Sequence, residues 1–153
     1  MTSWTTLKEQ SDFLNNQATF MRRDDIDYKY KAFLDGKSET EIYKHIIHNE
    51  LTIDNISSFG LPGKYTLRKN SYPYNFGAHL HYVFWINPLA GESTKTSVFD
   101  KYKLNQIINR LLSNSNTEYS RKLEGRERVI FRNAQQNKSV STIEHFHVIF
   151  RND

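Results

Sequence analysis

Apolar residues recur at helical spacing through the first fifty residues of the chain. They predict a helix within residues 4–20 and a second one in the run DDIDYKYKAFLDG, where it ends before Gly36, a residue typical of helix C-terminal caps. Ser38 and Glu41 form an S-x-x-E capping box, which predicts a third helix that continues to Leu51. The apolar positions are Trp4, Leu7, Phe13, Leu14 and Phe20 in the first helix, Ile26, Tyr30, Phe33 and Leu34 in the second, and Ile42, Ile46, Ile47 and Leu51 in the third.

After residue 51 the helical spacing gives way to short β-type runs. Residues 52–63 gather Gly, Pro and Ser and are predicted to be a connector. The runs KYTLRKN and HLHYVFWIN follow, separated by the turn formers of SYPYNFGA. This order predicts a β-hairpin at about 64–87.

The second half of the chain predicts one long helix and two further strands. Six apolar residues at helical spacing predict a helix over 97–114 with one apolar face. Strands are expected near 127–132 and 142–151. The apolar residues of the helix are Phe99, Leu104, Ile107, Ile108, Leu111 and Leu112. We therefore expect a single α+β domain over 1–153, with an N-terminal helical segment (1–51) packed on a sheet and helix core (64–153).

Composition limits the classes of protein to consider. The 153 residues include no cysteine, which excludes thiol catalysis and a disulfide framework. No apolar run approaches the roughly 20 residues of a membrane span and no signal peptide is evident, so we expect a soluble protein of the cytoplasm or the nucleus, without a membrane partner. The net charge of +4 is spread along the chain, which does not indicate nucleic-acid binding but leaves room for a small phosphorylated ligand.

Four of the six histidines fall in two H-x-H pairs, His79 with His81 and His145 with His147. Residues two apart in a strand point to the same face, so each pair is expected to share one side of the sheet. Three interpretations stay open from spacing alone. The rings could be half-buried structural residues, or they could perform phosphoryl or nucleotidyl transfer. Alternatively, one pair could supply two ligands of a metal ion, with the other pair or Glu144 as the remaining ligands.

Two stretches resemble the signatures of the histidine-triad superfamily. LRKNSYPYNFGAHLHYVFW is similar to its first signature, and RNAQQNKSVSTIEHFHVIFR is similar to its second. From about Tyr28 to Arg151 the chain also resembles the fungal N-acetylglucosamine-induced protein family, whose biochemistry is unassigned. The matching residues are Asn70, Pro73, Tyr74, His79, Leu80, Ser139, Val140, Ile143, His145, His147 and Val148.

The chain departs from the superfamily pattern at the first of its three alternating histidines. Ile143 stands there, Lys138 replaces the loop glutamine, and Asn137 replaces the glycine before it. Kept in register from the C-terminal side, the resemblance implies that His145 is the nucleophile and His147 the third histidine. It also implies a histidine-triad-like fold and a homodimer formed through the long helix and the last strands.

Three hypotheses for function follow. The first is a phosphoesterase or nucleotidyl transferase that acts on a nucleotide or nucleotide sugar, with His145 and His147 catalytic. The second is a fold of the same kind that binds such a ligand without turnover, and the third is a metal-dependent hydrolase that uses both histidine pairs. We assign no cofactor and no resident metal. The residues expected to bind substrate are Asn70, His79, His81, Lys138, Ser139 and Arg132.

Other residues receive structural roles at this stage. His45 and His48 are read as surface or packing residues of the third helix, and Trp85 as a core residue. Tyr72 and Tyr74 could either stack on a base or sugar or simply pack the turn.

Overall fold

The computed structural model describes residues 1–51, 58–61, 65–90, 99–115, 117–134 and 143–153. Its centre is a five-stranded sheet in the order β1-β2-β3-β5-β4, with every neighbouring pair antiparallel. The strands are β1 (Ser58–Leu61), β2 (Tyr65–Lys69), β3 (Leu80–Ile86), β4 (Arg128–Phe131) and β5 (His145–Phe150). The inner position of β5 brings the second H-x-H pair beside β3.

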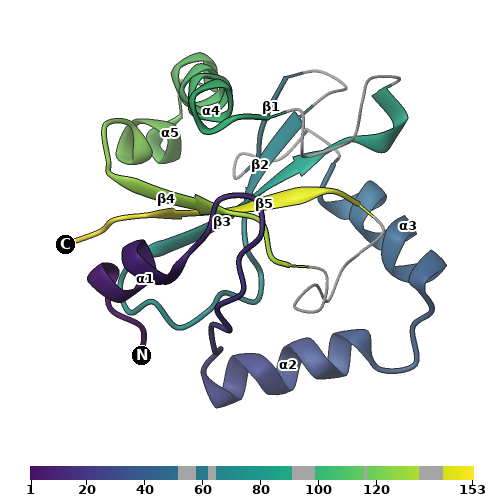
Figure 1. Ribbon diagram of the computed structural model, residues 1–153. Coiled ribbons are helices and arrows are strands. Elements are labelled where there is room, and N and C mark those ends of the chain that lie inside the picture. Colours follow the sequence, from purple (N-terminus) through teal and green to yellow (C-terminus); the bar gives the residue numbers. More distant parts are fainter. Residues whose placement is uncertain (52–57, 62–64, 91–98, 116, 135–142) are drawn as a thin grey trace.

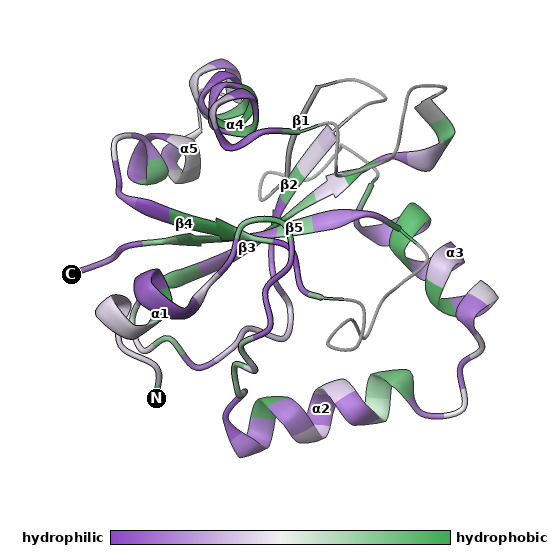
Figure 2. Ribbon diagram, in the orientation of Figure 1, coloured by the Kyte–Doolittle hydropathy of each residue, from purple (hydrophilic) through white to green (hydrophobic). Residues whose placement is uncertain are grey.

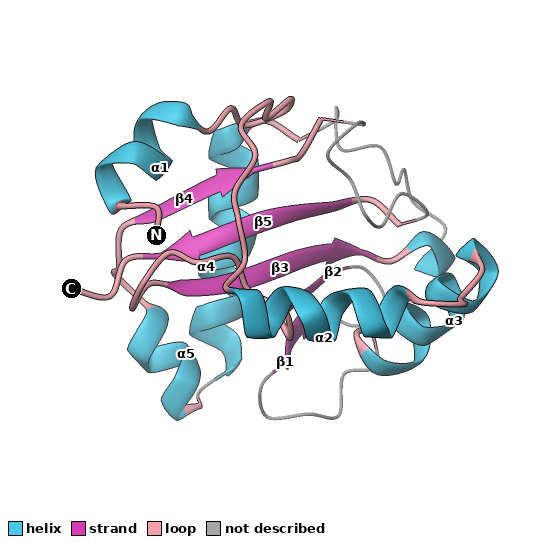
Figure 3. Cartoon of the chain, turned by 90° about the horizontal axis from the view of Figure 1, so that it is seen from below, coloured by secondary structure: helices cyan, strands magenta, loops and turns pink. Residues whose placement is uncertain are grey.

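Helices cover both faces of the sheet (Figures 1 and 3). On one face lie α4 and α5, and on the other lie α1, α2 and α3. The helices are α1 (Trp4–Gln10), α2 (Asp24–Leu34), α3 (Glu39–Asn49), α4 (Lys101–Ser115) and α5 (Glu118–Leu123), and a short 3-10 helix spans Pro88–Ala90. None of the helices in the described part of the chain has the length and apolar character that a membrane span requires.

The alternation of side chains in β3 divides the core between the two faces. Tyr82 and Phe84 pack with the apolar residues of α4, whereas His81, Val83 and Trp85 point to the opposite face. Phe146 and Val148 in β5 also belong to the α4 side, so His145 and His147 share the face of His81. All three histidines are therefore directed toward α2 and α3.

Several sequence predictions are confirmed. The α+β class, the hairpin formed by β2 and β3, and the long helix α4 are all present, and the six apolar residues predicted for that helix are buried in one cluster. The capping box of Ser38 and Glu41 begins α3, and Gly36 follows α2 with a φ of 71°.

Other predictions differ from the structure. The helix expected over 4–20 ends at Gln10, because the Asp12 carboxylate accepts hydrogen bonds from the backbone of Leu14 and Asn15 and forms a turn. The predicted connector contains β1, which pairs with β2 at the edge of the described sheet, and α5 was not predicted.

The helix α2 stands apart from the main cores. Figure 2 shows that most of its residues are hydrophilic, and Tyr30 is its single buried residue. Its aromatic side chains contact Tyr72, which follows β2: the ring centroids of Tyr30 and Phe33 lie 5.1 and 5.6 Å from that of Tyr72. In this way α2 lies across the histidine face of the sheet, with a space left between the helix and the histidines.

Candidate functional site

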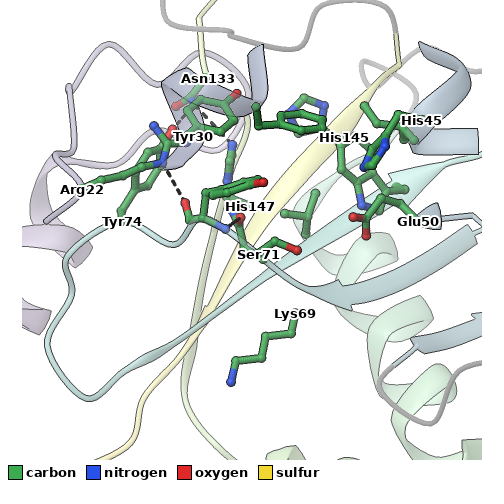
Figure 4. A pocket seen from close by; sticks show the side chains of 16 residues that line it. Arg22, Tyr30, His45, Glu50, Lys69, Ser71, Tyr74, Asn133, His145 and His147 are labelled. Atoms are coloured by element: carbon green, nitrogen blue, oxygen red, sulfur yellow. Dashed lines mark hydrogen bonds between the residues drawn. The ribbon is translucent and has the colours of Figure 1, made fainter. Parts of the chain in front are cut away.

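A cavity lies between the histidine face of the sheet and the helices α2 and α3 (Figure 4). Its cavity volume is about 120 Å³, and the empty space rises to about 790 Å³ when the open mouth is included. His145 and His147 lie near the middle of the group, with Arg22, Tyr30 and Asn133 on one side and His45 and Glu50 on the other. The cavity is thus formed by segments from both ends of the sequence.

The register of β3 and β5 sets the positions of the histidines. Val83 pairs with His147 and Trp85 pairs with His145, so His81 lies diagonally across from His147. The Nε2 atom of His81 is 2.8 Å from Nδ1 of His147, a distance that fits a direct hydrogen bond between the two rings.

His81 and His147 stay neutral at physiological pH. Burial, together with the positive charges of Arg22 and of protonated His145, lowers the pKa of His81 to about 3. Burial also lowers the pKa of His147 well below its usual value, with added repulsion from protonated His81 and His145 and from Arg22. Both rings therefore act in the site as neutral imidazoles.

His145 is oriented by the backbone of its own strand. Its Nδ1 atom lies 2.8 Å from the carbonyl oxygen of Ile143. A carbonyl oxygen only accepts, so in the neutral form of the ring Nδ1 carries the proton and the lone pair is on Nε2. The ring lies 4.8 Å from the Trp85 indole and 5.4 Å from the His147 ring, which hold it beside the cavity.

Arg22 brings a positive charge to the histidine cluster. Its Nε donates to the carbonyl oxygen of Tyr72 at 2.7 Å, and its guanidinium carbon lies 4.0 Å from the ring of Tyr30 and 4.7 Å from that of Tyr74. Among the described residues no carboxylate forms an ion pair with it. The guanidinium is thus held in place at the cavity, and no carboxylate of the described ranges neutralises its charge.

The other end of the cavity carries a carboxylate. Glu50 pairs with Arg68 at 3.1 Å, and both side chains are largely buried. Burial raises the pKa of Glu50, although Arg68 and His45 act in the opposite direction. His45 lies beside it with its ring 4.7 Å from Phe33. The two ends of the site therefore differ in charge, with the cation near the histidines.

The structure brings together part of the predicted residue set. Asn70, His81, His145 and His147 are gathered at or directly beneath the cavity. Lys138 and Ser139 lie outside the described residues, so their predicted roles stay predictions.

Two residues that we expected at the site lie elsewhere. His79 precedes β3 rather than extending it, accepts a hydrogen bond at Nδ1 from the backbone N–H of Asn152, and packs against Trp4 at 5.0 Å. The predicted convergence of all four paired histidines is therefore wrong for His79. Arg132 donates from Nε to the carbonyl oxygen of Leu14, because it follows Phe131 and points away from the histidine face.

Sequence reasoning missed several residues of the site. Arg22 gives no local signal, since it precedes a helix in a run of charged residues, and His45 and Trp85 were assigned to packing. Asn133 offers a weak signal, because polar residues directly after a buried strand are often positioned at a site. It lies 3.1 Å from both Asn16 and Tyr74, contacts that no local pattern predicts.

The histidine geometry does not favour a shared metal ion. Two imidazole nitrogens bound to one tetrahedral zinc ion lie roughly 3.3 to 3.4 Å apart, given Zn–N distances of about 2.0 to 2.1 Å. The facing nitrogens of His81 and His147 are 2.8 Å apart and bond to each other. In the described part of the chain no group of three or more His, Cys, Asp or Glu is arranged to hold a metal ion.

Fold and site together define an α+β protein with a buried histidine cluster beneath a cavity. A family model described as "Protein of unknown function (DUF3605)" matches residues 3–151, and the chain belongs to this family. No curated protein matches the chain. These findings give no support to the predicted links with the histidine-triad superfamily or the N-acetylglucosamine-induced family, which stay resemblances.

The fold also has a likeness among solved structures. The crystal structure of HTC1 is similar with a TM-score of 0.51 and 21% sequence identity, over 88% of this chain and 77% of HTC1. At this level of identity the likeness concerns the fold alone.

Proposed function

We propose that the protein is a phosphoesterase or nucleotidyl transferase that acts on a small phosphorylated substrate, with His145 as the nucleophile. The observation that carries the proposal is the bond from His145 Nδ1 to the carbonyl oxygen of Ile143, at 2.8 Å. It places a lone pair on Nε2 of a ring that borders the cavity. The nearby charge of Arg22 favours an anionic substrate.

The reaction follows from this arrangement for a pyrophosphate-linked substrate, such as a dinucleotide or nucleotide sugar. The Nε2 lone pair forms a bond to phosphorus while the bond to the bridging oxygen breaks, and the leaving phosphate departs as an anion without needing a proton. Water then forms a P–O bond as the N–P bond breaks, and one proton passes to the solvent. His147, beside the nucleophile, contacts the transferred phosphoryl group.

The experiment is turnover of such substrates by the purified protein, combined with intact-mass measurement of a phosphoryl or nucleotidyl adduct on histidine. We expect His145→Ala to lose the adduct and to reduce turnover at least about a thousandfold. His48→Ala, an exposed histidine on α3, is the matched control and should retain both. An adduct that persists in His145→Ala would refute the assignment of the nucleophile.

A binding protein without turnover is the second candidate. The observation that favours it is Ile143, whose buried side chain packs with Trp85 and Ile46 at the position where the superfamily pattern has a histidine. In this case nucleotides or sugar phosphates raise the melting temperature while no product forms. The same assay therefore separates the two candidates.

A further inference from the structure

The hydrogen bonds of the histidine cluster form a chain, and at each end of this chain a backbone group fixes the direction of the bond. At one end the backbone N–H of Tyr74 donates to Nδ1 of His81 at 3.1 Å. At the other end Asn16 donates from Nδ2 to the carbonyl oxygen of Ala18 at 3.0 Å and to Oδ1 of Asn133 at 3.1 Å. Neither the amide proton nor the carbonyl oxygen can change its role, so both ends determine what lies between them.

From the first end the proton positions follow one by one. Because Nδ1 of His81 accepts, the proton of its neutral ring is on Nε2, which donates to Nδ1 of His147 across 2.8 Å. The proton of neutral His147 is then on Nε2. This atom faces Nδ2 of Asn133 at 3.3 Å. Since Oδ1 of Asn133 is engaged by Asn16 and one amide hydrogen is donated to the Tyr74 hydroxyl at 3.1 Å, the amide presents its other hydrogen to His147.

Two donors therefore face each other at the edge of the cavity. A second pair of facing donors occurs at Asn70. Its Oδ1 accepts from the backbone N–H of Tyr72, so its Nδ2 is a donor, and this atom lies 3.3 Å from the protonated Nε2 of His81. These two contacts are longer than the 2.8 to 3.1 Å bonds around them, as expected where two donors meet. Within the part of the chain that the structure describes, no acceptor lies between the members of either donor pair, and unmatched buried donors are costly.

We propose that His147 Nε2–H, the Asn133 amide and the Arg22 guanidinium form an oxyanion site that holds a phosphoryl oxygen. An oxygen placed against the two facing donors supplies the acceptor that the cluster lacks, and Arg22 neutralises its charge. All three residues line the cavity, and His147 and Asn133 are each 6% exposed. The place of this site in catalysis rests on the proposed function, whereas anion binding does not require turnover.

The inference is tested with inorganic phosphate as the probe, in isothermal titration calorimetry of the full chain. Asn133→Asp keeps the acceptor for Asn16 but turns the facing donor into an acceptor, which satisfies His147 internally. We expect it to weaken phosphate binding at least a hundredfold, and Arg22→Gln to weaken it about tenfold. Lys29→Gln removes the same charge from the exposed side of α2 and should leave binding unchanged.

Ser71→Asp is the control for the added negative charge, since Ser71 is an exposed residue at the rim of the cavity. Its effect should be much smaller than that of Asn133→Asp. Equal weakening by the two variants would overturn the inference, as would unchanged binding in Asn133→Asp. Nitrogen-15 NMR of the imidazole rings gives an independent readout: we expect a proton on Nε2 of His147, and a proton on Nδ1 would refute the site.

The two proposals can fail separately. His145→Ala is expected to keep phosphate binding while losing turnover, because its ring is not one of the three donors. If no substrate is turned over but phosphate binding responds to Asn133→Asp and Arg22→Gln as stated, the enzymatic proposal falls and the oxyanion site stands. If turnover occurs without that response, the oxyanion site falls alone.

Discussion

His81 is the residue on which the arrangement of the cluster depends. It accepts from the backbone of Tyr74 and donates to His147, so the tautomer of one ring determines the tautomer of the next. Its ring is 3% exposed and lies against those of Tyr74 and Phe76, at 5.0 and 5.8 Å. Such an environment excludes the charged form and keeps the proton order fixed over a wide pH range.

This burial predicts a loss of stability in mild acid. The folded pKa of about 3 lies below the unfolded value of 6.5, so the unfolded state binds more protons and the stability present above pH 6.5 is lost as the pH falls toward 3. For His81 alone the loss between pH 7 and pH 5 is about 2 kcal/mol. Urea unfolding at both pH values measures it, and His81→Gln should lessen the difference while the exposed control His48→Gln should not. An equal pH dependence in all three proteins would contradict this role.

At the scale of the elements, α1 contacts the sheet in two ways, through a buried apolar cluster and through hydrogen bonds at the surface. Trp4 and Leu7 enter an apolar cluster with Phe20, Val129 and other residues. On the surface, the Glu127 carboxylate accepts from Trp4, Lys8 and Arg151, and these hydrogen bonds, with Lys8 first, lower its pKa to about 2. Exposed contacts of this kind contribute little, so the buried cluster holds the helix.

Leu7→Ala should therefore destabilise the protein by about 2 to 5 kcal/mol, since Leu7 is fully buried and its truncation leaves a cavity. Thr5→Ala, on the exposed side of the same helix, should change the free energy of unfolding by no more than about 0.5 kcal/mol. Chemical denaturation of both variants provides the comparison. Similar values for the two would mean that α1 does not depend on its buried side.

The elements also mark how far the sequence could predict the fold. The α4 helix was predictable because the six apolar residues used for its prediction all belong to a single core. The apolar residues of the predicted helix over 4–20 instead belong to two different cores. Phe13 stacks on Phe146 at 5.2 Å on the α4 side of the sheet, whereas Phe20 packs with Phe131 on the opposite side. The spacing of these apolar residues therefore predicted one helix, but they lie on a segment that crosses the edge of the sheet and contacts both faces. The histidine face was readable from alternation, but Arg22 and Asn133 reach the site through contacts distant in sequence.

For the whole molecule, the central sheet joins three apolar clusters into one unit. Trp4 belongs to the cluster beside α1 and Trp85 to the cluster beside α3, and both clusters lie against strands that also carry the main core. Because β3 and β5 contribute side chains to both faces, neither face can lose its packing while the other remains intact.

We therefore expect unfolding to be a single transition. The variants Trp4→Phe and Trp85→Phe each leave one tryptophan as a local fluorescent probe of a different cluster. Each variant should give the same midpoint by fluorescence as by far-ultraviolet circular dichroism. Separate midpoints for the two probes within one variant would show that the clusters unfold independently.

The strand order has a consequence for how the molecule comes into being. Residues 145–150 are the last in sequence of the five described strands, yet they occupy an inner place in the sheet, and β3 and β4 are each hydrogen-bonded to them rather than to one another. During synthesis β5 must be translated before β3 and β4 can be joined in one sheet. Until then the edges of β3 and β4 that later pair with β5 lack their hydrogen-bond partner. Two of the three clustered imidazoles lie on the same segment, so the sheet and the histidine cluster are completed in the same folding step.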